Sequence, residues 1–406
     1  MLGRDFTAMG TTSASQHISH STSGLITTTD NVSIQRAPLV GNAMRRATLV
    51  LVIPWIERRQ DLFSYITTCS DLYNAGIPFL LRFHYVITSR NVSQFNQFMK
   101  SKSSTSFLAL RSLELVSNPN LHGRMGLDAV NSLAEILRSA SNLRHVQVTG
   151  DLLNRYRALY KALASLPSLR CLDLHGTWGY EPAQLKLLSQ LQSPLRVLRM
   201  GELEDDLDII LTLANFRRTL EELQLEKTKF CYSPTSLCYP NLTYLHVTSI
   251  RNLRLSSFIP AFPNLRTLNF SCLDGFDDED EDIRDSNIRF QTRHPSQRWF
   301  LTSLAGDIES LYTLGLQSEV SVVSVDVTES SLYGAGSKLA DACLTPLRPL
   351  QLSLQNDDED IDDASWLKDT IATNCNELVR LSLSFTLTAE DIELPDYLGE
   401  CLVSDS

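Results

Sequence analysis

The chain has 406 residues, a hydrophobic fraction of 43% and a formal net charge of −11 at pH 7. This length is large for one compact core and favours either several domains or an array of repeats. The longest apolar stretch, residues 49–56, is too short to cross a bilayer and is interrupted by Pro54. The eight cysteines form no C-x-x-C pair, which argues against a zinc or redox site of that kind.

The N-terminal part of the chain divides into a polar tail and an apolar segment. Residues 1–46 are rich in serine and threonine near their start and lack the apolar core of a secretory signal. We therefore predict a disordered tail and a cytoplasmic or nuclear location. Residues 47–85 contain IPWIERRQDLFSYITTCSDLYNAGIPFLLR at positions 53–82. This segment is predicted to be a short helical module, and one interpretation is a cap that covers the core of a first repeat.

A hexapeptide of the form L-x-x-L-x-L recurs within residues 86–395. Its copies are LRSLEL (110–115), LRHVQV (143–148), LRCLDL (169–174), LRVLRM (195–200), LEELQL (220–225), LTYLHV (242–247), LRTLNF (265–270), LYTLGL (311–316), LRPLQL (347–352) and LVRLSL (378–383). Between positions 143 and 265 successive copies start 22 to 26 residues apart, which is the period of a leucine-rich repeat. The apolar spacing between copies is helical. We therefore predict an α/β leucine-rich-repeat solenoid, a horseshoe with a parallel sheet on its concave face.

Side chains between the apolar positions of each hexapeptide are predicted to point out of the sheet on the concave face, because side chains alternate along a strand. The position between the last two apolar residues is polar in most copies but is Gly315 in the copy at 311–316. We expect Asp173 and Arg199, which share a row on neighbouring strands, to pair. The residues on this face that we predict to bind a partner protein, called the client below, are His145, Gln147, Asp173, His175, Arg199, Glu222, Gln224, Tyr244, His246 and Asn269.

Two acidic runs account for the negative charge of the chain. Residues 274–285 hold eight acids and one arginine, and residues 356–363 hold six acids. Blocks of like charge repel one another, so both runs are predicted to be solvated loops, with a landing site for a basic partner as the alternative. The rest of the chain is close to neutral and has no basic stripe with interleaved aromatics, so we expect no nucleic acid partner. Residues 396–406 are predicted to be a short tail.

The segment at 53–82 resembles an F-box, the helical module that docks onto the Skp-type adaptor of cullin–RING ubiquitin ligases. Ile53-Pro54 is similar to the Leu-Pro that opens the family's motif, and residues 62–66 are similar to its Ile-Phe-x-x-Leu helix. Together with the repeats, residues 50–390 resemble the F-box/leucine-rich-repeat proteins that are numerous in mushroom-forming fungi. The resemblance implies adaptor contacts at Pro54, Leu62, Phe63 and Ile66.

The resemblance also implies a function. It predicts a substrate-recognition subunit of an SCF-type ubiquitin ligase, in which the repeats hold a client protein near the transferring enzyme. Its partners would be a Skp-type adaptor and a client that the sequence does not identify, with no membrane contact and a monomeric state outside the complex. The alternative is a stand-alone leucine-rich-repeat scaffold without a ligase, in which the N-terminal module is only a cap. A cell-surface receptor would need a signal peptide and cysteine-rich caps, and we expect neither.

Catalysis is not indicated by the sequence. Motifs of phosphate-binding loops, zinc proteases and nucleophile elbows are absent from the 406 residues. His145, His175 and His246 are predicted on three different strands. Neighbouring strands lie about 4.8 Å apart, so His175 and His246, three spacings from each other, cannot share a ligand. We expect no enzymatic activity, no metal and no cofactor.

Overall fold

The computed structural model describes residues 49–101, 104–117, 125–149, 152–175, 182–201, 209–226, 237–248, 253–271, 278–327, 338–344, 347–349, 351–356, 370 and 378–385. The predicted tails at 1–46 and 396–406, and the acids of the second acidic run at 357–363, lie outside these residues. Within the described ranges, no helix combines the length and the apolar character needed to cross a membrane.

The described strands form one parallel sheet of 12 strands, and each strand pairs with the strands before and after it in the sequence. The strands are β1 (His84–Ile87), β2 (Ser112–Val116), β3 (His145–Thr149), β4 (Cys171–His175), β5 (Val197–Gly201), β6 (Glu222–Glu226), β7 (Tyr244–Thr248), β8 (Thr267–Ser271), β9 (Ser303–Asp307), β10 (Val322–Val327), β11 (Gln351–Asn356) and β12 (Arg380–Phe385). Strands β2 to β8 each begin two residues after the start of a predicted hexapeptide. The predicted α/β repeat solenoid with a parallel sheet is therefore confirmed.

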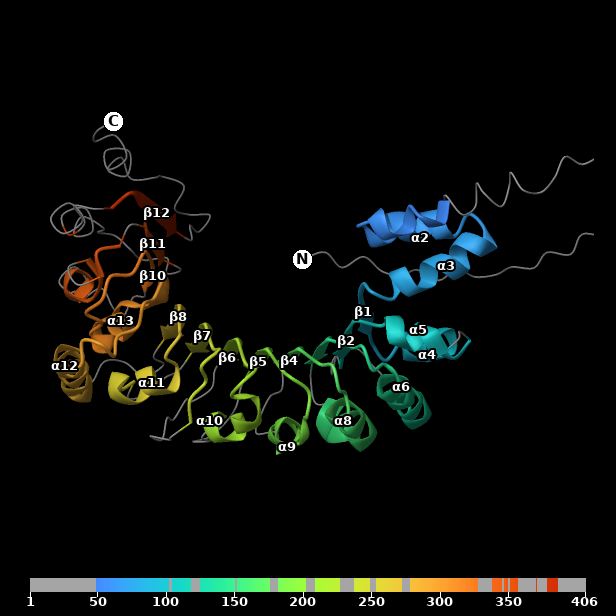
Figure 1. Ribbon diagram of the computed structural model, residues 1–406, viewed down its shortest axis with the longest axis horizontal. Helices are drawn as coiled ribbons and strands as arrows, with labels where there is room; N and C mark the ends of the chain where they lie inside the picture. The colour runs from blue at the N-terminus through green and yellow to red at the C-terminus, as the bar shows by residue number, and fades with distance from the viewer. Residues whose placement is uncertain are drawn as a thin grey trace, which may run out of the picture. The chain divides into compact units, whose positions relative to one another are not determined.

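Helices connect the strands and cover one side of the sheet (Figure 1). They are α4 (Val92–Lys100), α5 (Ser104–Ala109), α6 (Leu127–Ser139), α7 (Leu152–Arg155), α8 (Arg157–Ala164), α9 (Pro182–Gln190), α10 (Ile209–Thr212), η2 (Ala214–Phe216), α11 (Leu255–Ala261), α12 (Asp278–Arg293), α13 (Ile308–Leu314) and η4 (Ala340–Leu344, a π-helical turn). Successive helices contact each other, as α6 does α8 and α8 does α9. The described helices leave the other side of the sheet open (Figure 1).

The core is a ladder of aliphatic side chains that continues from one strand to the next. Leu113, Val146, Leu172 and Leu198 are partners in register on β2 to β5, and each is 0% exposed. Burying one such side chain stabilises the fold by about 2 kcal/mol. No single repeat encloses this row, so each repeat depends on its neighbours for burial.

Asparagine side chains tie neighbouring repeats together just before the strands. The Asn142 amide donates to the Leu108 carbonyl at 3.0 Å, the Asn241 amide to the Arg218 carbonyl at 2.5 Å, and the Asn264 amide to the Pro240 carbonyl at 2.7 Å. Each of these residues stands directly before the first leucine of a hexapeptide. The bonds satisfy carbonyl groups at the turns that lead into the strands.

The predicted strand at 311–316 is wrong. Residues Ile308–Leu314 form helix α13, and the strand of this repeat is β9, which precedes it. The carboxylate of Asp307 caps the helix by accepting from the Ser310 backbone N–H at 2.7 Å. Gly315 ends the helix with φ 56°, a left-handed conformation that glycine adopts without strain. Leu311 and Leu314 satisfy a helical spacing as well as the hexapeptide pattern.

The first acidic run is not the loop that its charge predicted. Residues 278–285 form the first half of α12, whereas residues 274–277 lie outside the described part. Acids at a helix N-terminus interact favourably with the helix dipole, which offsets part of their mutual repulsion. The helix is also anchored by Ile283, Asn287 and Gln291, which are 4%, 1% and 0% exposed.

Candidate functional site

The open face of the sheet brings the predicted client-binding residues together. Gln147, Asp173, Arg199, Gln224, His246 and Asn269 follow one another in register across β3 to β8. His145, Glu222 and Tyr244 occupy the neighbouring row, and His175 lies on the opposite side of the central row. All are half-buried except Asp173, which is buried. Their predicted position on one face is confirmed, while their role in binding stays a prediction.

Arg199 is the centre of a charged network on this face. Its guanidinium donates to Glu222 Oε1 at 3.1 Å from Nε and at 2.8 Å from Nη2. The Gln224 amide donates to the same carboxylate oxygen at 2.9 Å. The predicted pair with Asp173 is present as a longer contact of 4.0 Å from Arg199 Nη1 to Asp173 Oδ2. The hydrogen bonds to Glu222 raise the pKa of Arg199, so this side chain is a fixed cation.

Asp173 lies between His175 and Arg199. Its Oδ1 atom is 2.6 Å from His175 Nε2, and its other oxygen faces Arg199. The bond to Asp173 raises the pKa of His175, an effect that burial opposes. A buried carboxylate needs such partners, because an unpaired charge of this kind is costly to remove from water.

A second polar cluster, at the β1 end of the open face, includes residues that the sequence did not single out. His84 Nδ1 is 2.7 Å from Ser112 Oγ, and His84 Nε2 is 3.0 Å from Glu114 Oε2. Ser112 Oγ is in turn 3.1 Å from His145 Nδ1. Burial, and then the neighbouring His84, lowers the pKa of His145. His84 was missed because β1 (HYVI) does not carry the hexapeptide pattern; only its place before the first repeat could have indicated it.

Burial changes the acid–base properties of two side chains on the open face. Cys171 is the one thiol on the described strands of this face, and burial raises its pKa to about 11, so it is a protonated thiol at neutral pH and a poor nucleophile. Burial also lowers the pKa of His246. In the described ranges, no group of three or more histidine, cysteine, aspartate or glutamate side chains is placed to hold a metal ion. A fixed network of donors and acceptors on an open sheet is suited to contact with another macromolecule.

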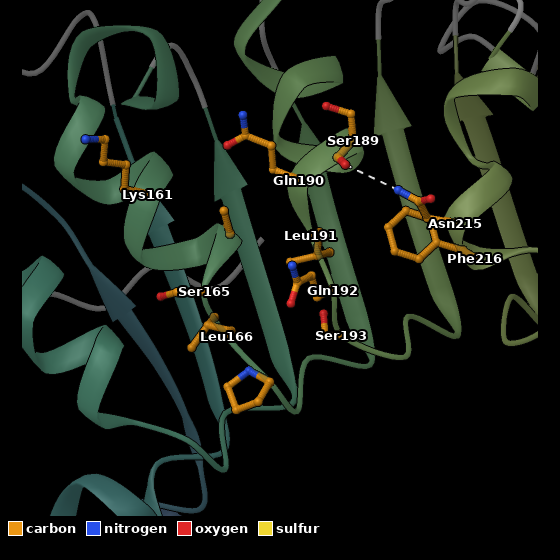
Figure 2. Close-up of a pocket in the computed structure, with 12 residues that line it drawn as sticks. Lys161, Ser165, Leu166, Ser189, Gln190, Leu191, Gln192, Ser193, Asn215 and Phe216 are labelled. Atoms are coloured by element: carbon orange, nitrogen blue, oxygen red, sulfur yellow. Dashed lines mark hydrogen bonds between the residues drawn. The ribbon is translucent and has the colours of Figure 1, made fainter.

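An open pocket of ≈1050 Å³ lies on the helical side, between α8, α9 and η2 (Figure 2). Amides and hydroxyls contribute most of its polar groups, and Lys161 is its one charged side chain. The Asn215 amide, which lines the pocket, donates to the Ser189 carbonyl at 3.2 Å. The lining offers no pair of titratable groups, so it gives no basis for acid–base chemistry.

The N-terminal module consists of η1 (Ile53–Trp55), α2 (Arg59–Ile66) and α3 (Ser70–Leu80). It has a small core of its own, made by Ile53, Leu62, Ile66, Leu72 and Leu80. The helices approach closely, because a Cβ atom on Gly76 would lie 2.2 Å from Ile66 Cγ2. The module also joins the core of the repeats, to which α3 contributes Ile77 and, just after it, Leu81.

The module's core contains two of the four predicted adaptor contacts. Leu62 and Ile66 are 1% and 0% exposed, so neither side chain is available to a partner. Their spacing of four residues puts them on one face of α2, and that face is turned toward η1 and α3. Pro54 is exposed, and Phe63, on another face of α2, is 54% exposed. Only these two of the four predicted contacts are accessible.

Other apolar side chains of the module are more exposed than the predicted ones. Leu51 is 70% and Trp55 is 80% exposed. With Phe63 they form the set that we call the exposed apolar residues of the module. Exposed aromatic and aliphatic side chains concentrated in a short segment are typical of interaction sites. The F-box resemblance implied contacts at Leu62 and Ile66, which are buried, and did not single out Leu51 or Trp55.

Comparisons with known proteins found similarity among solved structures. No family model matches the sequence, and no curated protein matches it. Among solved structures, a chain from the crystal structure of the Rad7 and Elc1 complex in yeast is similar over 86% of this chain and 87% of that chain, with 13% sequence identity and a TM-score of 0.38.

Proposed function

We propose that this chain is a substrate-recognition subunit of an SCF-type cullin–RING ubiquitin ligase. In this proposal the N-terminal module binds a Skp-type adaptor, and the open face of the sheet binds a client protein. The chain then supplies proximity rather than chemistry, because it raises the concentration of the client near a transferring enzyme. It would have no catalytic residue and would act in the cytoplasm or the nucleus.

The observation that supports adaptor binding is the exposure of Leu51, Trp55 and Phe63 on a module that already has its own core. Burial of Leu62 and Ile66 makes the module a folded unit, so its exposed apolar residues are not needed for its own stability. Tryptophan and other large side chains contribute most of the binding energy at many protein interfaces.

A second candidate function is a binding scaffold in which the module is only a cap. Ile77 and Leu81 support it, because they are 3% and 0% exposed and belong to the core of the repeats. An open solenoid end needs such a cover. The two roles involve different surfaces, since α3 covers the repeats while Trp55 and Phe63 face solvent.

Co-purification of the full chain with a Skp-type adaptor tests the proposal. The chain should retain the adaptor, and the double variant Trp55→Ala/Phe63→Ala should bind it at least tenfold more weakly, as expected for loss of interface anchors. Phe300→Ala is the matched control, because Phe300 is 84% exposed and lies outside the module. The thermal unfolding temperature should be unchanged in both variants. If the unmodified chain does not retain the adaptor, the scaffold function replaces the ligase function.

A further inference from the structure

A row of arginines crosses the sheet one residue before strands β2 to β5. It consists of Arg111, Arg144, Arg170 and Arg196, each following the first leucine of a hexapeptide. Backbone N–H groups link them directly, from Arg144 to the Arg111 carbonyl at 2.9 Å, from Arg170 to Arg144 at 2.8 Å and from Arg196 to Arg170 at 2.8 Å. Neighbouring strands lie about 4.8 Å apart, so this arginine row spans about 14 Å.

The middle of the arginine row lacks counter-charges. Arg144 and Arg170 are exposed, and no carboxylate in the described part of the chain lies within ion-pairing distance of either. The repulsion also affects the end of the row, because burial and then the charges of Arg144 and Arg82 lower the pKa of Arg111. Like charges held this close repel, and a bound anion would relieve that repulsion.

The next position along the same line shows which anion the geometry accepts. On the next strand this position is Glu221, whose backbone N–H donates to the Arg196 carbonyl at 2.8 Å. Its Oε1 atom is 3.2 Å from Arg196 Nη1. A carboxylate one strand spacing away thus already pairs with the last arginine of the row, and no described carboxylate pairs in this way with the other arginines.

We propose that the arginine row binds an acidic segment of the client protein, with several aspartate or glutamate residues in close succession. An extended chain rises about 3.3 Å per residue, so a row of about 14 Å covers four to five residues. Arginine suits this ligand, because its planar guanidinium can bind a carboxylate through two parallel hydrogen bonds. The inference rests on the proposed function in that it describes a client segment, which would bind where strands β2 to β5 begin.

A nucleic acid fits this surface less well. The residues that follow the arginines are Ser112, His145, Cys171 and Val197, so no phenylalanine, tyrosine or tryptophan stands between them for bases to stack on. Carboxylates of Asp173, Glu221 and Glu222 lie on the adjacent strands and would repel a continuous phosphate backbone. A short acidic peptide can avoid these carboxylates more easily than a polyanion can.

Fluorescence anisotropy with the full chain and a labelled ten-residue peptide of glutamate and glycine tests the inference. The peptide should bind to the unmodified chain, and more weakly as salt rises from about 50 to 300 mM. Its affinity for the variant Arg144→Gln/Arg170→Gln should be at least fivefold lower. Arg266→Gln is the matched control. Arg266 holds the same position before β8, but its neighbours in the ladder are Thr243 and Thr302. This variant should change affinity less than twofold.

Two kinds of result would overturn the proposal. Equal binding of a glutamine-for-glutamate peptide, or full binding by the double variant, would show that the arginine row is not the site. Tighter binding of single-stranded DNA, or binding of a phosphoserine peptide alone, through the same arginines would give the row a different occupant. If Arg144→Gln/Arg170→Gln lowers the unfolding temperature, Arg144→Glu/Arg170→Glu with a lysine peptide provides a second test by charge exchange. Adaptor binding is not measured, so this result and that of the adaptor experiment are independent.

Discussion

At the scale of single residues, Asp173 shows that the alternation of apolar and polar residues predicts the direction of a side chain but not its burial. Alternation along the strand predicted that its side chain lies on the open face, and it does. It is nevertheless only 5% exposed, because His175 and Arg199 close over its carboxylate. Alternation gives the direction of a side chain, whereas its burial depends on long neighbours from other strands, which a local pattern does not encode.

The pair of His175 with Asp173 makes a prediction about pH. The pKa of His175 is raised above the value of about 6.5 that an unfolded histidine has, so the stabilisation is complete below that value and is lost as pH rises through the folded pKa. His175→Gln should therefore lower the free energy of unfolding by about 1 kcal/mol at pH 5.5 and by much less at pH 9. Urea denaturation at both pH values measures the difference.

His246→Gln provides a control of opposite sign. Burial lowers the pKa of His246, so this group costs stability as the pH falls, and its replacement should help at pH 5.5 rather than harm. A cost of His175→Gln that is equal at both pH values would mean that the lost contact is not electrostatic.

At the scale of secondary structure elements, α12 shows why a run of acidic residues is not sufficient to predict a loop. Its first turns are acidic, but Tyr312 donates to Glu281 at 3.0 Å, and the Arg284 guanidinium lies 4.2 Å from the centroid of the Tyr312 ring. The buried stripe of the helix repeats every four residues and is largely amide rather than aliphatic. A search for apolar periodicity therefore finds no helix in this segment.

The buried amide of Asn287 should be the main anchor of α12. Its Oδ1 atom accepts from the Leu255 N–H at 2.8 Å, and its Nδ2 donates to the carbonyls of Leu253 at 2.9 Å and Thr313 at 3.3 Å. Asn287→Ala leaves buried backbone groups of two neighbouring repeats unpaired, which should destabilise the protein by about 3 kcal/mol in urea denaturation.

Arg289→Ala is the matched control for this helix, because its side chain is 68% exposed and its ion pair with Asp285, four residues earlier, is at the surface. It should cost less than about 0.5 kcal/mol. Similar small losses in both variants would show that α12 is not held by its buried amides.

Much of the sheet could be predicted from the sequence, and the exceptions have physical reasons. Strands β2 to β8 follow the hexapeptides, because an apolar alternation with a regular period leaves only one way to stack. The register fails at residues 311–316, where leucines spaced three apart satisfy a helix, and the cap at Asp307 decides between the two. Strand β1 was missed since its pattern is half-exposed at the end of the sheet.

The candidate site was predictable in position but not in partners. The row from Gln147 to Asn269 was found, since register follows from the repeat. Two of the four predicted adaptor contacts are buried, because the apolar spacing of α2 marks the face that packs in the module's own core. Leu62 and Ile66 formed the inner face.

At the scale of the described chain, two cores meet in α3. The module's core contains Leu72 and Leu80, whereas Ile77 and Leu81 belong to the core of the repeats. Tyr73 and Tyr85 pack against both. The module therefore packs on the first repeats, and in a solenoid each repeat is stabilised mainly by contacts with its neighbours.

This arrangement predicts that damage to the module stays local. Leu62→Ala removes a side chain that is 1% exposed from the module's small core and should cost about 3 kcal/mol there. Amide hydrogen exchange should then accelerate in residues 59–80 while β7 and β8 keep their protection, since strands β2 to β6 separate them from β1 in the sheet. Phe63→Ala, at the adjacent and exposed position, should leave exchange unchanged throughout.

Adaptor binding should be reduced by both variants, through unfolding in the first and through a lost contact in the second, so only exchange separates the two causes. Equal acceleration in the module and in β7 and β8 would instead mean that the chain unfolds as one cooperative unit, and adaptor binding and client binding could then not be disabled independently by changes in the module's core.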